Sequence, residues 1–154
     1  MPEFISNSVQ VHVAAFDDTT GDLSFLLLQR SESVNPYPML WQTITGWIED
    51  GETALEAAIR ELKEEVSLEP LKIWTLPYVA NFFDADNDLV HSSPVFGILV
   101  DFKKDITISD EHQEFLWLRY KPALKKLMLP SHRDGLKIFK KFILTNINEN
   151  YFLS

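Results

Sequence analysis

The segment from Gly46 to Leu68, GWIEDGETALEAAIRELKEEVSL, most constrains what this chain can fold into. Gly46 and Gly51 bracket a loop that must turn tightly or admit a close approach to its backbone. Thr53 is followed three residues later by Glu56, which is the spacing of a capping box. The segment therefore predicts a glycine-bracketed loop and then a helix that begins at Thr53.

The predicted helix carries a cluster of carboxylates beside an apolar stripe. Residues i, i+3 and i+4 share a helix face, so Glu61, Glu64 and Glu65 are neighbours. Glu65 lies next to the stripe and should be the least solvated of the three. Like charges at this spacing destabilise a helix by about 0.2–0.5 kcal/mol per pair, and a divalent cation such as Mg²⁺ would relieve the repulsion. The stripe comprises Leu55, Ala58, Ile59, Leu62 and Val66.

Two further points concern the charges of this helix. Arg60 and Glu64 are four residues apart and are expected to pair, which would leave Glu61 and Glu65 freer to face a metal. The alternative interpretation is a solvated, glutamate-rich amphipathic helix with no site. Acidic helix faces are common, but this spacing together with both glycines is not, so we favour the metal site.

The segment resembles the signature of the Nudix hydrolases. That signature reads Gly, five residues, Glu, seven residues, then Arg-Glu-apolar-any-Glu-Glu-any-Gly-apolar. The chain departs from it only at Ser67, which replaces the last glycine, so the acidic positions are intact and the C-terminal cap of the helix is altered. The matching positions are Gly46, Glu52, Arg60, Glu61, Leu62, Glu64, Glu65 and Leu68.

The resemblance implies a metal site and a set of catalytic residues. Mg²⁺, which Mn²⁺ can replace, would be held by Glu61 and Glu65, with Glu64 as a further ligand. A loop glutamate would complete the site, and Glu111 is preferred to Glu114 because Glu111-His112 followed by Trp117 resembles that region of the family. The Gly46 carbonyl is a further candidate ligand, and Glu52 and Arg60 would orient the carboxylates. Glu61, Glu64 and Glu111 all remain candidates for the general base, and His112 would support a ligand or lie at the surface.

The family fold is an α/β/α sandwich with a mixed central sheet, an α+β arrangement, and the order of elements here agrees with it. Alternating or apolar runs predict strands at residues 9–16, 24–30, 41–46, 73–83, 89–102 and 115–120. The strand at 73–83 should bend at Pro77 and form a hairpin with 89–102 at the sheet edge. A short helix is expected after Pro122, and a last amphipathic helix through Leu136, Phe139, Ile143 and Ile147.

Composition narrows the class of protein. The 154 residues, 45% of them hydrophobic, suit a single domain over 1–154 with its own core. The chain contains no cysteine, which excludes disulfides, cysteine–zinc sites and thiol catalysis. No signal peptide and no apolar run of about 20 residues is present, so a cytoplasmic protein without membrane contact is expected. The net charge of −9 argues against a nucleic-acid polymer as partner and favours a small phosphorylated substrate bound through cations.

Four residues are candidates for contacts to the substrate. Arg30, at a strand end, is either a surface residue or a contact to phosphate or base. Tyr37 and Trp41 either line a pocket for a flat ring or belong to the core and its rim, and the second interpretation is favoured. The resemblance adds Thr45 as a substrate contact. The sequence does not fix the oligomeric state, and a homodimer is one alternative.

Outside the motif, LLLQR, WQTITGWIEDGET and EHQEFLWL resemble the branch with bacterial dATP and dihydroneopterin triphosphate pyrophosphatases. This resemblance implies that a (deoxy)nucleoside or pterin triphosphate is cut to a monophosphate and pyrophosphate. Other branches cut dinucleoside polyphosphates, ADP-ribose or NADH. A non-catalytic nucleotide-sensing module is a further alternative, but such modules usually lose helix acids that this chain retains.

Overall fold

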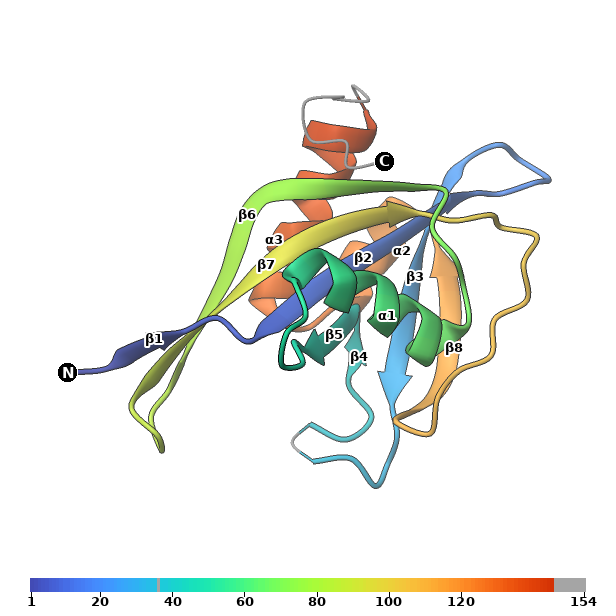
Figure 1. Cartoon of the computed structure of the whole chain (residues 1–154). Coiled ribbons are helices and arrows are strands. Elements are labelled where there is room, and N and C mark those ends of the chain that lie inside the picture. The colour runs from blue at the N-terminus through green and yellow to red at the C-terminus, as the bar shows by residue number, and fades with distance from the viewer. Residues whose placement is uncertain (36, 146–154) are drawn as a thin grey trace.

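The computed structural model describes residues 1–35 and 37–145, which form one mixed sheet with helices on both faces (Figure 1). The strands are β1 (Glu3–Ile5), β2 (Ser8–Phe16), β3 (Leu23–Arg30), β4 (Trp41–Gln42), β5 (Ile44–Trp47), β6 (Lys72–Asp84), β7 (Leu89–Leu99) and β8 (His112–Leu118). The helices are α1 (Ala54–Val66), α2 (Tyr120–Lys126) and α3 (Pro130–Ile138), and α3 continues into a π-helical segment at Phe139–Leu144.

The eight-stranded sheet is organised around β2 and β3. Its order is β1-β7-β2-β3-β4, with β5 beside β2, β6 beside β7 and β8 beside β3. The β1–β7 and β2–β7 pairs are parallel and the others are antiparallel. β2 and β3 pair only at one end, from Ala14 to Phe16 on β2. Elsewhere β2 pairs with β5 and β3 pairs with β4, so the segment that leads into the motif is held by both central strands.

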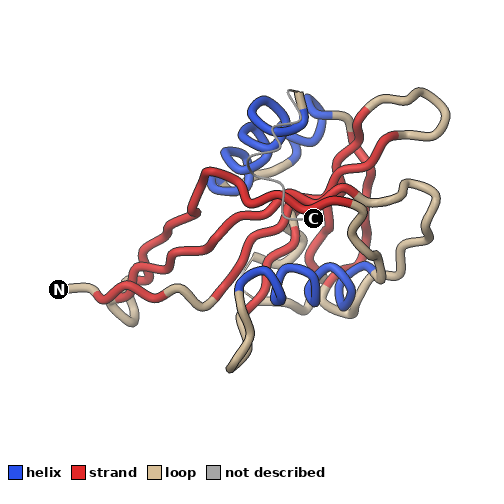
Figure 2. The backbone as a smooth tube through the Cα atoms, turned by 45° about the horizontal axis from the view of Figure 1, so that its top comes forward, coloured by secondary structure: helices blue, strands red, loops and turns tan. Residues whose placement is uncertain are grey.

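Alternation along β2 divides the core into two layers. Val9, Val11 and Val13 face α1 and pack with its apolar stripe, whereas Ala14 packs with the helices of the opposite face. Figure 2 shows α1 on one side of the sheet and the C-terminal helices on the other. The predicted α/β/α sandwich with a mixed sheet is therefore confirmed.

The capping box is confirmed. The Thr53 hydroxyl accepts from the Glu56 amide, and the Glu56 carboxylate accepts from the Thr53 amide. At the other end of α1, Ser67 adopts the left-handed conformation with φ 60°, and its N–H donates to the Lys63 carbonyl. Ser67 thus takes the backbone conformation that favours glycine at a helix end.

The predicted strands all exist, but three of them differ in extent. The expected strand at 41–46 is divided into β4 and β5 around Thr43, and β7 ends at Leu99 instead of 102. β8 begins at His112, three residues early, because the polar residues before Phe115 still pair with β3. β6 and β7 form the expected edge hairpin, and their register breaks between Thr75 and Val79, which brackets Pro77.

The C-terminal helices also differ from expectation in detail. The last helix is interrupted where α3 passes into the π-helical segment, although the predicted apolar residues Leu136, Phe139 and Ile143 are all buried. Ile147 lies outside the described residues. Within the described part of the chain, none of the helices has the length and apolar character needed to cross a membrane.

Candidate active site

Arg60 is the centre of a charged network on the exposed side of α1. Its Nε and Nη2 donate to the two carboxylate oxygens of Glu52 at 2.7 and 2.9 Å, and Nη2 also donates to the Trp47 carbonyl at 2.8 Å. The Arg60 hydrogen bonds lower the pKa of Glu52 to about 2. This fork joins α1 to the loop that precedes it.

The remaining nitrogen of Arg60 binds the motif acids. Nη1 donates to Glu64 Oε2 at 3.0 Å, so the predicted Arg60–Glu64 pair is confirmed. The same Nη1 donates to Glu61 Oε1 at 2.9 Å. The expectation that this pairing would leave Glu61 free is therefore wrong, because one guanidinium nitrogen reaches both carboxylates.

Glu61 is buried against the backbone of β5. A Cβ placed on Gly46 would lie 2.1 Å from Cδ of Glu61, so only glycine leaves room for this carboxylate. Burial, together with the charges of the neighbouring Glu65 and Glu64, raises the pKa of Glu61 to about 7, against the hydrogen bond and charge of Arg60. The motif glycine thus allows a carboxylate to lie where its charged form is poorly solvated.

Glu65 is held by two side chains that lie 44 and 47 residues later in the sequence. Ser109 Oγ donates to Glu65 Oε2 at 2.7 Å, and His112 Nδ1 lies 2.9 Å from the same oxygen. Burial raises the pKa of Glu65, but the hydrogen bonds from His112 and Ser109 outweigh it, and the net shift is downward. The side chain of Glu65 is 8% exposed, against 10% for Glu61 and 56% for Glu64, so Glu65 is the least exposed of the three, as predicted.

Ser109, just before β8, and His112, the first residue of β8, are these donors, but the described part of the chain shows no side-chain contact of the expected glutamate beside them. Glu111 is exposed, and its carbonyl accepts from the Ser31 amide at 2.9 Å. No described contact joins its side chain to α1. Glu114 is also exposed, on β8 opposite Gln29. The role of Glu111 stays a prediction, and sequence reasoning missed Ser109, for which the sequence offers no signal beyond its nearness to Glu111.

The expected substrate residues lie around β3, β4 and β5. Arg30 ends β3, where its Nη1 lies 3.5 Å from Gln42 Oε1 and its buried Nε has no hydrogen-bond partner among the described residues. Thr45 is exposed on β5, and Tyr37 is exposed in the loop before β4. Trp41 is half-buried against the core below α2, with Lys126 Nζ 4.8 Å from its ring centre, as the favoured core-or-rim interpretation expected.

The carboxylates of α1 supply the oxygen ligands that a hard divalent cation prefers. Glu61 and Glu65 are buried carboxylates on one helix face, and Glu64 adds an exposed carboxylate beside them. In the described ranges, no three histidine or acidic side chains already converge into a cage. Mg²⁺ keeps several waters and is usually bound by one or two carboxylates together with substrate phosphates.

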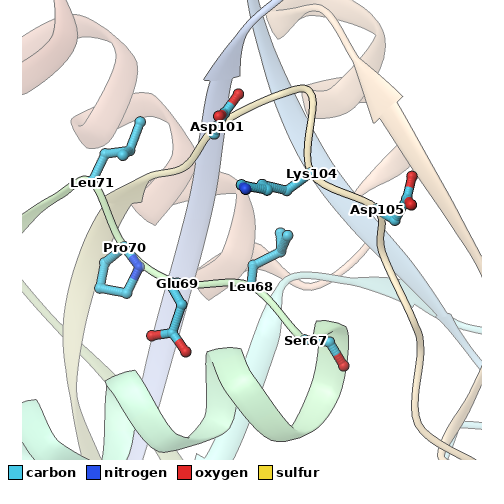
Figure 3. A pocket seen from close by; sticks show the side chains of 8 residues that line it. All are labelled: Ser67, Leu68, Glu69, Pro70, Leu71, Asp101, Lys104 and Asp105. Atoms are coloured by element: carbon cyan, nitrogen blue, oxygen red, sulfur yellow. The ribbon is translucent and has the colours of Figure 1, made fainter.

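A pocket of about 300 Å³ lies away from these acids, beyond the C-terminal end of α1 (Figure 3). Ser67 and the residues after it form one side, and Asp101, Lys104 and Asp105 from the loop after β7 form the other. None of the predicted site residues lines it. The candidate site is therefore the acid cluster on α1 and not this pocket.

Comparison with known proteins identifies the family. A family model described as NUDIX domain matches residues 7–139. The chain belongs to the NUDIX family. It is thus a Nudix hydrolase, and its relatives include a tetraphosphatase and a diphosphatase.

Two relatives cover most of this Nudix hydrolase. The asymmetrical bis(5'-nucleosyl)-tetraphosphatase of Mus musculus is 29% identical over 136 residues, which is 85% of this chain and 86% of that protein. The dihydroneopterin triphosphate diphosphatase of Haemophilus influenzae is 28% identical over 123 residues, covering 73% and 75%. The structure of the E. coli dihydroneopterin triphosphate pyrophosphohydrolase superposes with a TM-score of 0.69 at 25% identity, over 90% of this chain and 94% of that chain.

Proposed function

We propose that this Nudix hydrolase cuts a pyrophosphate bond in a (deoxy)nucleoside or pterin triphosphate, releasing a monophosphate and pyrophosphate with the help of Mg²⁺. The observation that carries the proposal is the acid cluster of α1, in which Glu61 and Glu65 are buried beside each other and each is held by its own donors. The triphosphate class is supported by relatives that act on dihydroneopterin triphosphate.

Glu61 and Glu65 would hold the cation, with Glu64, the Gly46 carbonyl and Glu111 as further ligands. When bound, Mg²⁺ supplies charge neutralisation for the phosphates and acidifies a bound water. The chain itself orients the carboxylates: Arg60 fixes Glu61, while Ser109 and His112 fix Glu65. Pre-positioning of this kind shortens the search for reactive geometry, which is a large part of phosphoryl-transfer catalysis.

The attacking water must lose a proton to a carboxylate oxygen. Glu61 is one candidate, because its pKa of about 7 in the cation-free protein suits a general base. Glu64 and Glu111 are exposed and would take the proton if Glu61 serves as a ligand.

Arg30 is the proposed phosphate contact. The buried Nε of Arg30 has no described partner, and the only described hydrogen bond of its side chain, to Gln42, is long at 3.5 Å. A guanidinium with unused donors is suited to a phosphate, which accepts a pair of parallel hydrogen bonds. Thr45, Trp41 and Tyr37 are proposed to contact the rest of the substrate.

A dinucleoside polyphosphate is the second candidate substrate. The Mus musculus tetraphosphatase covers 85% of this chain, more than the 73% covered by the Haemophilus influenzae relative. Both substrates contain the same pyrophosphate bond, and the motif acids would serve either.

The test is a substrate panel incubated with Mg²⁺: nucleoside triphosphates, dihydroneopterin triphosphate, dinucleoside polyphosphates and ADP-ribose. Release of pyrophosphate from a triphosphate supports the first proposal, and a nucleoside triphosphate released from a dinucleoside tetraphosphate supports the second. Binding without any hydrolysis would contradict both and favour a nucleotide-sensing module. Omission of Mg²⁺ and the Glu65→Gln variant provide the controls.

A further inference from the structure

Arg30 and Glu65 are joined by hydrogen bonds through Gln42 and His112. Arg30 Nη1 lies 3.5 Å from Gln42 Oε1, Gln42 Nε2 lies 3.0 Å from His112 Nε2, and His112 Nδ1 lies 2.9 Å from Glu65 Oε2. These residues belong to β3, β4, β8 and α1, which the fold brings together from four parts of the chain (Figure 1). This series of hydrogen bonds connects Arg30, a proposed phosphate contact, with Glu65, a proposed metal ligand.

The chemistry of the groups fixes the direction of every hydrogen bond. A guanidinium can only donate, so Gln42 must turn its oxygen toward Arg30 and its NH₂ toward His112. His112 Nε2 must then accept, which leaves the proton on Nδ1. Nδ1–H donates to Glu65, whose carboxylate can only accept when ionised. Each step has one consistent polarity.

We propose that Gln42 is a positioning residue that, oriented by Arg30, keeps the proton of His112 on Nδ1 and thereby fixes the carboxylate of Glu65. His112 and Ser109 both bind Oε2 of Glu65, so Oε1 is the oxygen available to a cation. This inference deepens the proposed function and rests on it for the role of Glu65 as a ligand. The hydrogen-bond chain itself does not depend on it.

Burial gives the network its rigidity. Gln42 is 4% exposed, and His112 and Glu65 are comparably buried. Water cannot replace a lost partner at such positions, so a reversed Gln42 amide or the other histidine tautomer would leave a buried donor facing a donor. The arrangement is therefore a single state, set at one end by Arg30.

The first test reads the histidine tautomer directly. The ¹⁵N spectrum of histidine-labelled, metal-free protein is recorded at pH 8, and the His112 signals are assigned with a His112→Asn variant. We expect Nδ1 to be protonated and Nε2 unprotonated in the wild type. In Gln42→Glu the new carboxylate can only accept, so Nε2 should become protonated as well, while Nδ1 keeps the proton that it donates to Glu65. A protonated Nε2 in the wild type, or an unchanged ring in Gln42→Glu, would overturn the inference.

The second test measures the affinity for Mn²⁺, followed by its paramagnetic effect on water relaxation. Loss of a residue that orients a ligand typically lowers metal affinity roughly 10–100-fold, and we expect Gln42→Leu to fall in that range. Gln113→Leu is the matched control, because Gln113 lies on the same strand as His112 but donates to Gln29 at 3.0 Å, outside the network. Its affinity should equal that of the wild type, and thermal unfolding of both variants checks that they fold.

The outcomes separate this inference from the proposed function. Wild-type protein that binds Mn²⁺ and hydrolyses a triphosphate, with Gln42→Leu binding Mn²⁺ equally well, would overturn the inference alone. Wild-type protein that binds no Mn²⁺ would overturn the metal-dependent function and the metal-orienting role of Gln42 together. A tenfold or larger loss in Gln42→Leu, with no loss in Gln113→Leu, supports both.

Discussion

The two faces of the sheet both bury polar side chains beneath a helix, but with opposite electrical character. Under α1 the buried polar groups include the carboxylates of Glu61 and Glu65, which are bound to charged or hydrogen-bonding partners. Under α3 they include two histidines, His12 and His132, whose pKa values burial lowers to about 3 and about 4. One face retains charge, and the other is neutral at ordinary pH.

On the neutral face, His12 and His132 are hydrogen-bonded to neighbouring polar groups. Gln10 Nε2 lies 2.8 Å from His12 Nε2 and donates to the Ser131 carbonyl at 3.0 Å, and the Thr43 amide donates to His132 Nδ1 at 3.3 Å. Such bonds join the first turns of α3 to β2 and β4–β5 without burying a charge. They explain packing and require no ligand.

On each face a glycine, which lacks a Cβ, leaves space for a buried polar side chain: Gly46 for Glu61 and Gly135 for His12. A Cβ on Gly46 would lie 2.1 Å from Glu61 Cδ, and a Cβ on Gly135 would lie 2.3 Å from His12 Nε2. The difference lies in the group that occupies this space: a carboxylate whose ionisation burial opposes, or a neutral ring that burial favours. Buried charge is expensive unless a partner or a cation compensates it, so the α1 face is the one expected to act on a ligand.

Of the variants that test this contrast, Glu65→Gln is expected to have the largest effect on turnover. Glutamine keeps the size of the side chain but not its charge, and we expect turnover to fall roughly 100- to 10,000-fold with the fold intact. Turnover on the best substrate of the panel is measured beside circular-dichroism melting. Glu69→Gln, an exposed acid just past α1, is the control and should keep wild-type turnover. Unchanged turnover in Glu65→Gln would remove the functional distinction between the faces.

The glycine pair sharpens the comparison. In Gly46→Ala the flexible end of Glu61 can swing away, so turnover should fall about 100-fold with little change in stability. In Gly135→Ala, His12 and Gln10 are enclosed beneath α3, so the free energy of unfolding should drop by roughly 1–3 kcal/mol with turnover retained at low temperature. Urea melts and turnover are measured for both. Equal effects on stability and turnover in the two variants would contradict the assignment of roles.

The neutral face predicts a pH dependence of stability. The folded-state pKa of His132, about 4, lies below its ordinary 6.5, so its contribution is present above pH 6.5 and is lost as pH falls toward 4. In His132→Asn the new amide oxygen can still accept from the Thr43 amide but does not titrate. Between pH 7 and 5 the wild type should lose about 2 kcal/mol more unfolding free energy than the variant. Parallel curves from urea melts would mean that His132 is not buried in its neutral form.

The extent of the charged face can be tested with two acids, Glu111 in the loop before β8 and Glu114 on β8. Glu111→Gln should raise the Mg²⁺ concentration for half-maximal turnover about tenfold if this loop completes the site. Glu114→Gln is the matched variant, since Glu114 is equally exposed but lies on β8. Magnesium titrations of both variants decide between them. The reverse order would place the ligand on Glu114.

The smallest effect is expected where the chain departs from the family motif. Ser67 has φ 60°, which a serine adopts at some strain and a glycine adopts freely. Ser67→Gly should therefore stabilise the protein by about 1 kcal/mol in thermal or urea unfolding, with turnover unchanged. A gain in stability coupled to a loss of turnover would show that strain at the end of α1 belongs to the site.

The sequence by itself determined the local features. The capping box, the apolar stripe of α1, the Arg60–Glu64 pair and the low exposure of Glu65 all depend on residues within a few helical turns. Period-two alternation likewise predicted β2 as a strand with one buried face, whereas the structure buries both faces and so divides the core into two layers. These features follow from the amino-acid sequence because spacing alone fixes which side chains share a face of a helix or strand.

Only the tertiary structure decided what surrounds the acids. Ser109 and His112 meet Glu65 across 44 and 47 residues, and Gln42 meets His112 across 70, because β3 pairs with both β4 and β8. The same pairing extended β8 to His112 through polar residues that carry no strand pattern. Contacts between residues so far apart in the sequence depend on how the strands pair, which local spacing does not encode. These contacts determine which side chains hydrogen-bond to the buried carboxylates.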